Sequence, residues 1–98
     1  MTFEELLDHA RRLEGQVLRT LAEGARFRVR VGADSLFYTP ESTGNERRHT
    51  FKFARRVFDR FVQRRSFKTV DYADISKNAS YMLAVISSYT ESAKQQGA

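Results

Sequence analysis

Arginines dominate the middle of this chain and are the residues that point most directly to chemistry. Arg26, Arg28 and Arg30 alternate with apolar residues along a predicted strand. A second row falls on a predicted helix and consists of Arg55, Arg56, Arg60, Arg64 and Arg65. A guanidinium group presents a rigid fork of N–H donors that matches two phosphate oxygens, which a lysine does less specifically. Together with Arg47 and Arg48, the two rows are the predicted nucleic-acid-binding residues.

A loop ahead of the second row is a candidate anion site. Ser42, Thr43 and Gly44 form this predicted anion-binding loop, because backbone amides in such a turn can surround an anion. A helix predicted to start soon afterwards would add a partial positive charge. The spacing differs from that of a P-loop. The alternative interpretation is that Ser42, Thr43 and Asn45 make hydrogen bonds within a turn.

Groups that could catalyse a reaction are few and scattered. His9 and His49 fall on separate predicted elements and lack the spacing of metal ligands. Asp71 and Asp74 bracket a predicted helix start, where capping and the helix dipole explain them. Tyr38 is a conceivable nucleophile for phosphoryl transfer only through its nearness in sequence to His49. The sequence therefore predicts no catalytic residue, no metal site and no cofactor.

Helical spacing of apolar residues predicts three helices that would position these groups. The first opens with the capping box Thr2-x-x-Glu5 and runs to Gly24 as its C-cap. The second follows a capping Thr50 and carries the second arginine row. The third begins near Asp74 or earlier and has its own apolar side.

A two-residue period predicts a β-hairpin between the first two helices. In the segment 26–31, arginines alternate with Phe and Val, as a strand that is buried on one side requires. A turn at 32–35 and a second strand at 36–39 complete the hairpin. Phe37 and Tyr38 should therefore face opposite sides. Because an isolated hairpin is marginally stable, it should pack on the helices, and its free edge could pair with another chain.

The predicted fold class is α+β, a small single domain in the order α-β-β-α-α with the antiparallel hairpin packed on helices. Residues 1–91 form the predicted domain, and residues 92–98 a frayed C-terminal tail. The chain has 98 residues, no cysteine and no signal-peptide pattern. Its longest apolar stretch, 81–86, is too short to cross a membrane. These features predict a cytoplasmic protein with no membrane partner.

Two short strings resemble a group of small uncharacterised bacterial domains with the patterns P-x-S-T-G-x-x-R and N-A-S-Y. The first string occupies residues 40–47, and the second, at 78–81, follows Asp71-Tyr72. The resemblance covers about residues 25–90 and brings no activity with it. It marks as positions of interest Ser42, Thr43, Gly44, Arg47, Asn78, Ser80 and Tyr81. A structural alternative is that the second string docks against the first by hydrogen bonds.

Charge distribution leads to the functional prediction. The net charge is +8 over residues 26–68, against −2 before and −1 after them. Such a segment attracts polyanions, which favours a non-enzymatic module that binds DNA or RNA. The two arginine rows would form one surface if the hairpin packs against the second helix. The alternative is a protein-interaction module, such as a homodimer formed through the hairpin edge or the last helix. Arginines that lack acidic partners would favour nucleic acid, and neutralised ones a protein partner.

Overall fold

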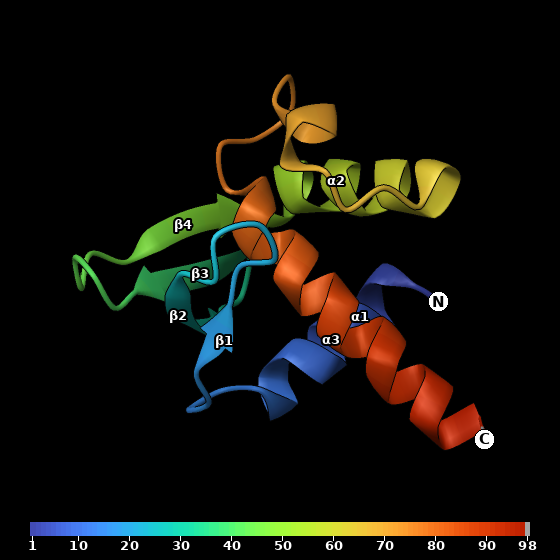
Figure 1. The fold of residues 1–98 in the computed structure, drawn as a ribbon, viewed down its shortest axis with the longest axis horizontal. Helices are drawn as coiled ribbons and strands as arrows, with labels where there is room; N and C mark the ends of the chain where they lie inside the picture. The colour runs from blue at the N-terminus through green and yellow to red at the C-terminus, as the bar shows by residue number, and fades with distance from the viewer. Residues whose placement is uncertain (98) are drawn as a thin grey trace.

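The computed structural model describes the backbone of residues 1–97 and the side chains of residues 1–94. The order of helices and strands is α-β-β-β-β-α-α (Figure 1). The helices are α1 (Phe3–Arg12), α2 (Phe51–Arg64), the short 3-10 helix η1 (Thr69–Tyr72) and α3 (Ala79–Gly97), and the strands are β1 (Leu18–Arg19), β2 (Arg26–Val31), β3 (Ser35–Pro40) and β4 (Arg47–Thr50). The predicted α+β class is confirmed, with two more strands than the sequence indicated.

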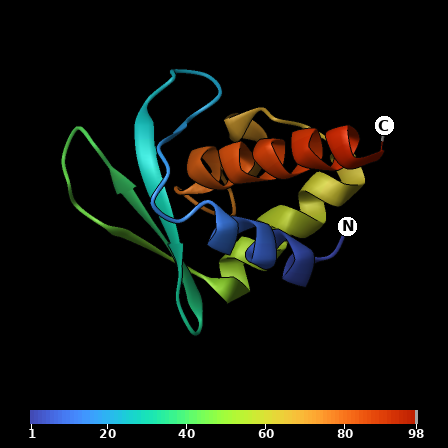
Figure 2. The same cartoon turned by 90° about the horizontal axis from the view of Figure 1, so that it is seen from below.

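The strands form one antiparallel sheet in the order β1-β2-β3-β4, and helices α1, α2 and α3 all lie on the same side of it (Figure 2). Along β2, Phe27 and Val29 are buried, whereas the three arginines between and beside them are exposed. Successive side chains of a strand point to opposite faces, so the apolar residues face the helices. We call the side that faces the helices the inner face and the other side the outer face.

A single core fills the space between the inner face and the helices. Its largest fully buried apolar side chains are Tyr38, Tyr72, Phe27, Phe61, Leu6, Leu36, Met82, Leu83, Ile86, Val57 and Val85. Burial of one large apolar side chain stabilises a fold by about 1.5–3 kcal/mol, so this core holds the sheet in a fixed position against the helices. Within the described residues, no helix has both the length and the apolar character that a bilayer crossing requires.

The first helix is much shorter than predicted. Its start is confirmed, because Thr2 Oγ1 accepts a hydrogen bond from the Glu5 N–H at 3.1 Å. The helix ends at Arg12, and Gly15 then adopts a φ of 87°, a left-handed conformation that glycine reaches at little cost. The chain turns there and enters β1. The predicted continuation to Gly24 was wrong because this turn ends the helix although the apolar spacing continues beyond it.

Strand β4 lies within a segment that was predicted to be a loop. It pairs with β3 so that His49 lies opposite Leu36 and Arg48 opposite Phe37. His49 is buried, so it occupies an inward position where strand patterns normally show an apolar residue. Because β1 pairs with β2 and β4 pairs with β3, the hairpin edges predicted to be open are occupied along these residues.

Helix α2 confirms the predicted helix with the second arginine row. Thr50 holds the N-cap position, but its side chain makes no capping hydrogen bond, contrary to the prediction. The helix ends where Arg65 adopts the left-handed conformation with a φ of 55°. The backbone N–H of Arg65 donates to the Phe61 carbonyl at 2.7 Å and closes the last turn.

Helix α3 begins later than predicted. Its first residue is Ala79, whereas the sequence indicated a start near Asp74. The connection from α2 includes η1 and a turn, and these use the intervening residues. The helix continues through residues 92–97, where the loss of apolar residues predicted a frayed tail. Residue 98 lies outside the described residues.

Candidate nucleic-acid interface

The outer face of the sheet carries five arginines. They are Arg19, Arg26, Arg28, Arg30 and Arg48. The register places Arg19 of β1 opposite Arg26, and Arg48 of β4 opposite Phe37. Residues directly opposite one another in an antiparallel pair share a face. Sequence reasoning missed Arg19 because it assigned this residue to the first helix, and a strand of two residues gives almost no periodic signal.

Three of these five arginines have an acidic partner. The pairs are Arg26 with Glu41 at 3.3 Å, Arg30 with Glu46 at 2.9 Å and Arg48 with Asp34 at 3.0 Å. Arg19 and Arg28 form no ion pair within the described part of the chain. Exposed pairs of this kind contribute roughly 0–1 kcal/mol to stability. The outer face therefore keeps two uncompensated positive charges beside three that are locally balanced.

Phe37 lies on the outer face beneath the side chain of Arg30. The Arg30 Cζ atom is 3.9 Å from the centre of the Phe37 ring, which is close stacking. The ring edge also lies against Gly32, where an added Cβ would be 2.8 Å from Phe37 Cε2. Tyr38 is fully buried on the inner face, so the prediction that the two aromatic residues face opposite sides is confirmed.

The cations of α2 form a second basic surface. Lys52, Arg56, Arg60 and Arg64 recur every four residues, which aligns them along one side of a helix. Arg55 pairs with Glu4 at 3.2 Å and Arg60 pairs with Asp74. Three arginines on or directly after this helix that were predicted to contact nucleic acid form no ion pair among the described residues, namely Arg56, Arg64 and Arg65.

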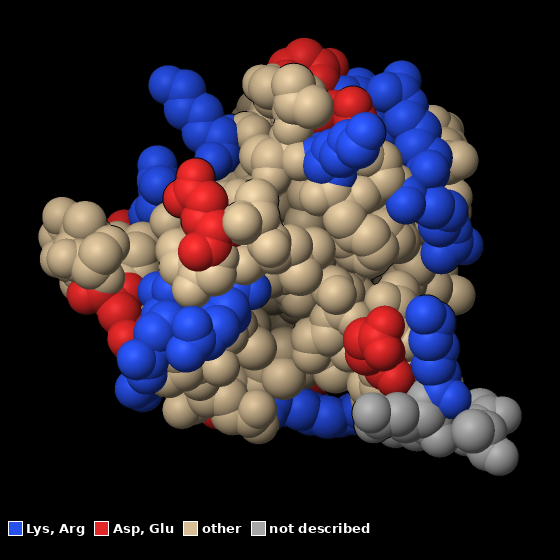
Figure 3. Space-filling model, viewed as in Figure 1, with Lys and Arg blue, Asp and Glu red and all other residues tan. Residues whose placement is uncertain are grey.

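The two basic surfaces are separate. The helices, α2 among them, lie on one side of the sheet (Figure 2). The buried residues of β2 face that side, so Arg26, Arg28 and Arg30 face away from it. Figure 3 shows one group of cations along α2 and another beside the sheet, with uncharged surface between them. The condition for a single continuous surface is therefore not met. Arg47 belongs to neither group: it lies opposite Tyr38 in the register, and its Cζ is 5.8 Å from the Tyr81 ring centre.

Arg60 has a structural role in its own segment. Its side chain is mostly buried and donates to both carboxylate oxygens of Asp74 and, at 3.0 Å, to the Asp71 carbonyl. The hydrogen bond from Arg60 lowers the pKa of Asp74. Asp71 bonds to the Ser66 hydroxyl. The two aspartates therefore hold the connection after α2 in position through hydrogen bonds. The prediction that they flank the start of the last helix was wrong, because α3 begins at Ala79.

Replacement of Arg60 should therefore cost stability. We expect Arg60→Ala to lower the free energy of unfolding clearly more than Arg56→Ala does, because a charge-assisted, two-pronged interaction and a hydrogen bond to a backbone carbonyl are lost. Arg56→Ala, on the same side of α2 but without an ion pair among the described residues, should change the free energy of unfolding by less than about 0.5 kcal/mol. Urea denaturation followed by circular dichroism measures both values. Equal losses in the two variants would contradict the structural role of Arg60.

The predicted anion-binding loop lies between β3 and β4. Gly44, with a φ of 69°, donates its N–H to the Pro40 carbonyl at 2.8 Å, and the Asn45 N–H bonds to Thr43 Oγ1 at 3.2 Å. Two loop amides are thus used within the turn, as the alternative interpretation of this loop expected. Strand β4 separates the loop from α2, so the predicted contribution of a helix N-terminus to Ser42, Thr43 and Gly44 was wrong.

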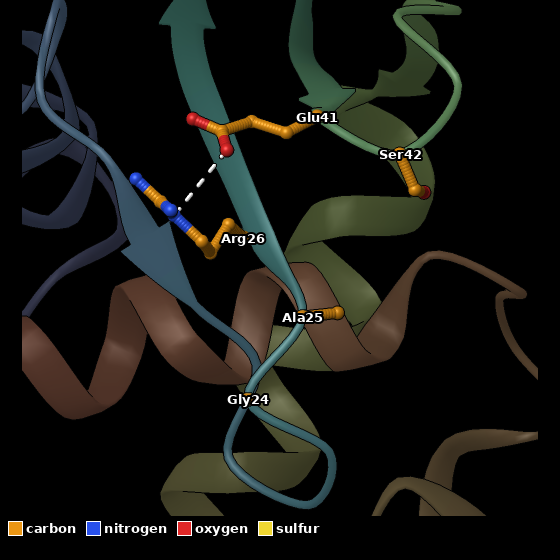
Figure 4. A pocket seen from close by; sticks show the side chains of 5 residues that line it. All are labelled: Gly24, Ala25, Arg26, Glu41 and Ser42. Carbon is orange, nitrogen blue, oxygen red and sulfur yellow. Dashed lines mark ion pairs between the residues drawn. The ribbon is translucent and has the colours of Figure 1, made fainter.

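Two open hollows border this loop. One of about 430 Å³ is lined by Gly24, Ala25, Arg26, Glu41 and Ser42, and Figure 4 shows the Arg26–Glu41 ion pair beside it. The other, of about 420 Å³, brings Tyr81 next to Ser42, Thr43 and Arg47. The Asn78 Nδ2 group donates to the Arg48 carbonyl at 3.3 Å. The string at 78–81 therefore lies beside the loop, but its hydrogen bond goes to Arg48 of β4 and not to the string at 40–47, which the structural alternative had named.

A chain of polar side chains crosses the core beneath the sheet. The Tyr38 hydroxyl is 2.9 Å from His49 Nδ1, and His49 Nε2 is 3.0 Å from Ser76 Oγ. Burial raises the pKa of Tyr38 and lowers the pKa of His49 to about 4. Both groups are therefore neutral at pH 7. A neutral, fully buried Tyr38 is poorly placed to act as a nucleophile.

The hydrogen-bond donors assign the tautomer of His49. The Tyr38 hydroxyl must donate its proton, and Nδ1 is its only partner among the described residues. The proton of neutral His49 then resides on Nε2, which donates to Ser76. A serine nucleophile needs the opposite arrangement, in which Nε2 accepts the hydroxyl proton. The chain of Tyr38, His49 and Ser76 thus joins β3 and β4 to the connection before α3.

The geometry singles out the outer face of the sheet as the candidate site. There Arg19 and Arg28, which have no ion pair in the described part of the chain, lie beside the stacked Arg30 and Phe37. Comparisons of the chain with protein-family models, with curated proteins and with solved structures gave no match.

Proposed function

We propose that this chain is a non-enzymatic module that binds nucleic acid through the outer face of its sheet. The observation that carries the proposal is the presence of five arginines on a sheet face that α1, α2 and α3 leave open. Guanidinium groups neutralise phosphates, and this attraction supplies most of the affinity of proteins for DNA or RNA without sequence preference.

The shape of the face supports an extended ligand. A four-stranded sheet is a broad surface, and its outward arginines come from β1, β2 and β4 rather than from one strand. Arg28 and Arg30 are two positions apart on β2, which separates their Cα atoms by about 7 Å. Positive charge and an aromatic ring on one open surface are the features that hold single strands. The cations of α2 offer a second phosphate-binding surface on another side of the molecule.

A titration at two salt concentrations tests this proposal. We expect a fluorescently labelled single strand to bind, and binding to weaken about tenfold when salt rises from about 50 to about 200 mM, as for two to three phosphate contacts. Fluorescence anisotropy measures the dissociation constants. Absence of binding to single-stranded DNA, duplex DNA and RNA at the lower salt concentration would overturn the proposal.

The alternative function is a protein-interaction or homodimerisation module. Neutralised arginines favour it, and on the outer face three of five have acidic partners. Light scattering at several protein concentrations distinguishes the two functions when combined with the titration. A stable dimer that binds no nucleic acid would favour the alternative.

A further inference from the structure

Arg30 differs from the other arginines of the outer face in how it is held. Its Nε and one terminal nitrogen donate to the two carboxylate oxygens of Glu46, each at 2.9 Å. The same guanidinium group lies 3.9 Å from the centre of the Phe37 ring, and that ring rests against Gly32. The side chain of Arg30 is still 52% exposed. One face of the planar guanidinium group therefore covers Phe37, and the opposite face is directed to solvent.

This arrangement suits Arg30 poorly as a phosphate contact. Glu46 neutralises the charge of Arg30 and accepts from two of the N–H donors with which an arginine would bind a phosphate. The solvent-facing plane remains available, and guanidinium planes stack on nucleic-acid bases as aromatic rings do. The neighbouring Arg28 has no ion pair among the described residues, so it can take the phosphate role beside this plane.

We propose that the Arg30–Phe37 stack, clamped by Glu46, is a platform on which an unpaired base of a single-stranded nucleic acid stacks. This inference rests on the proposed function and adds the class of ligand. Bases within a duplex expose only their edges in the grooves, because their planes are covered by neighbouring bases. Bases of a single strand can be splayed out and stacked on a protein surface. The platform therefore favours single strands over duplexes.

The test compares two arginines of the same strand. Arg26 and Arg30 both lie outward on β2 and both pair with a glutamate, but only Arg30 is stacked on an aromatic ring in the described structure. Arg30→Lys keeps the charge and removes the planar group, and Arg26→Lys is the matched control. Anisotropy titrations use a single strand of about 12 nucleotides, an abasic strand of equal length and the corresponding duplex.

We expect Arg30→Lys to weaken binding to the base-containing strand by about fivefold and to leave binding to the abasic strand unchanged. Arg26→Lys, which also keeps its charge, should change the affinity for the base-containing and the abasic strand by the same factor. A 2-aminopurine placed in the strand should lose fluorescence on binding to the wild-type protein and less on binding to Arg30→Lys. Thermal denaturation confirms that both variants fold.

The outcomes separate this inference from the function on which it rests. Salt-sensitive binding with equal affinity for base-containing and abasic strands would overturn the platform and leave the proposed function standing. Equal losses in Arg26→Lys and Arg30→Lys would also overturn it. If the wild-type protein binds none of the nucleic acids, both proposals fail together.

Discussion

Acidification from pH 6.5 to pH 4 should lower the free energy of unfolding by about 3 kcal/mol through His49 alone. His49 has a pKa of about 4 in the folded protein, because burial disfavours its charged form, and a pKa of about 6.5 when unfolded. Between these values the unfolded chain binds a proton that the folded chain does not. The stabilisation is therefore complete above pH 6.5 and is lost as the pH falls towards 4.

The hydrogen bonds around His49 explain why protonation is unfavourable. A proton on Nδ1 would leave the buried Tyr38 hydroxyl without its acceptor. Burial and Arg12 also lower the pKa of His9, so protonation of His9 at acidic pH likewise lowers the free energy of unfolding.

Urea denaturation at several pH values measures the effect and isolates its source. The window from pH 6.5 to pH 5 is the most informative, because most carboxylates remain ionised there. His49→Gln removes the titrating group and should flatten the slope of stability against pH in this window. His9→Gln is the matched control and should keep most of the slope of stability against pH. An unchanged slope in His49→Gln would show that His49 is not the group responsible.

The parts of the fold that were predicted correctly are those in which local periodicity and burial agree. The alternation of Arg26 to Val31 describes a strand with one covered face, and β2 has this pattern of burial. The spacing of Ala54, Val57, Phe58 and Phe61 describes one buried side of α2. In both segments each apolar position enters the core, so the sequence period and the tertiary structure give the same result.

The errors in the predicted secondary structure arise where a single residue decides the local structure against the apolar periodicity of the sequence. Gly15 turns the chain after α1, although apolar residues continue at helical spacing beyond it, and Leu21 on that extrapolated stripe is exposed. In β4 the inward position is filled by His49, whose ring is accepted in the core because both nitrogens have partners. The segment Arg-Arg-His-Thr has no apolar alternation, so its sequence predicts a loop and not a strand.

The arginines were identified from the sequence, but their roles depend on long-range contacts. Arg30 meets Glu46 across the sheet, and Arg60 meets Asp74 across the connection after α2. Nothing in the spacing of these residues indicates that one forms a stacked pair and the other a structural tie. Arg19 was missed because its place on the outer face follows from pairing with Arg26, which only the sheet register reveals.

Reversal of the two unpaired charges of the outer face should have the largest effect on binding. Arg19→Glu/Arg28→Glu should weaken the affinity for a single strand by about a hundredfold at low salt, because two phosphate contacts become repulsive. Neither residue has an ion pair within the described residues, so folding should be little affected. The salt dependence should also become shallower, since fewer counterions are released.

Arg56→Glu/Arg64→Glu is the matched control on α2, because it reverses two arginines of the separate basic surface that also have no ion pair among the described residues. The net charge changes equally in both double variants. A general effect of charge would therefore weaken binding equally in the two. A larger loss in the outer-face variant would place the main contact on the sheet, because screening confines each charge to about 10 Å at 0.1 M salt. A larger loss in the α2 variant would assign the main contact to the helix and contradict the outer face as the principal binding surface.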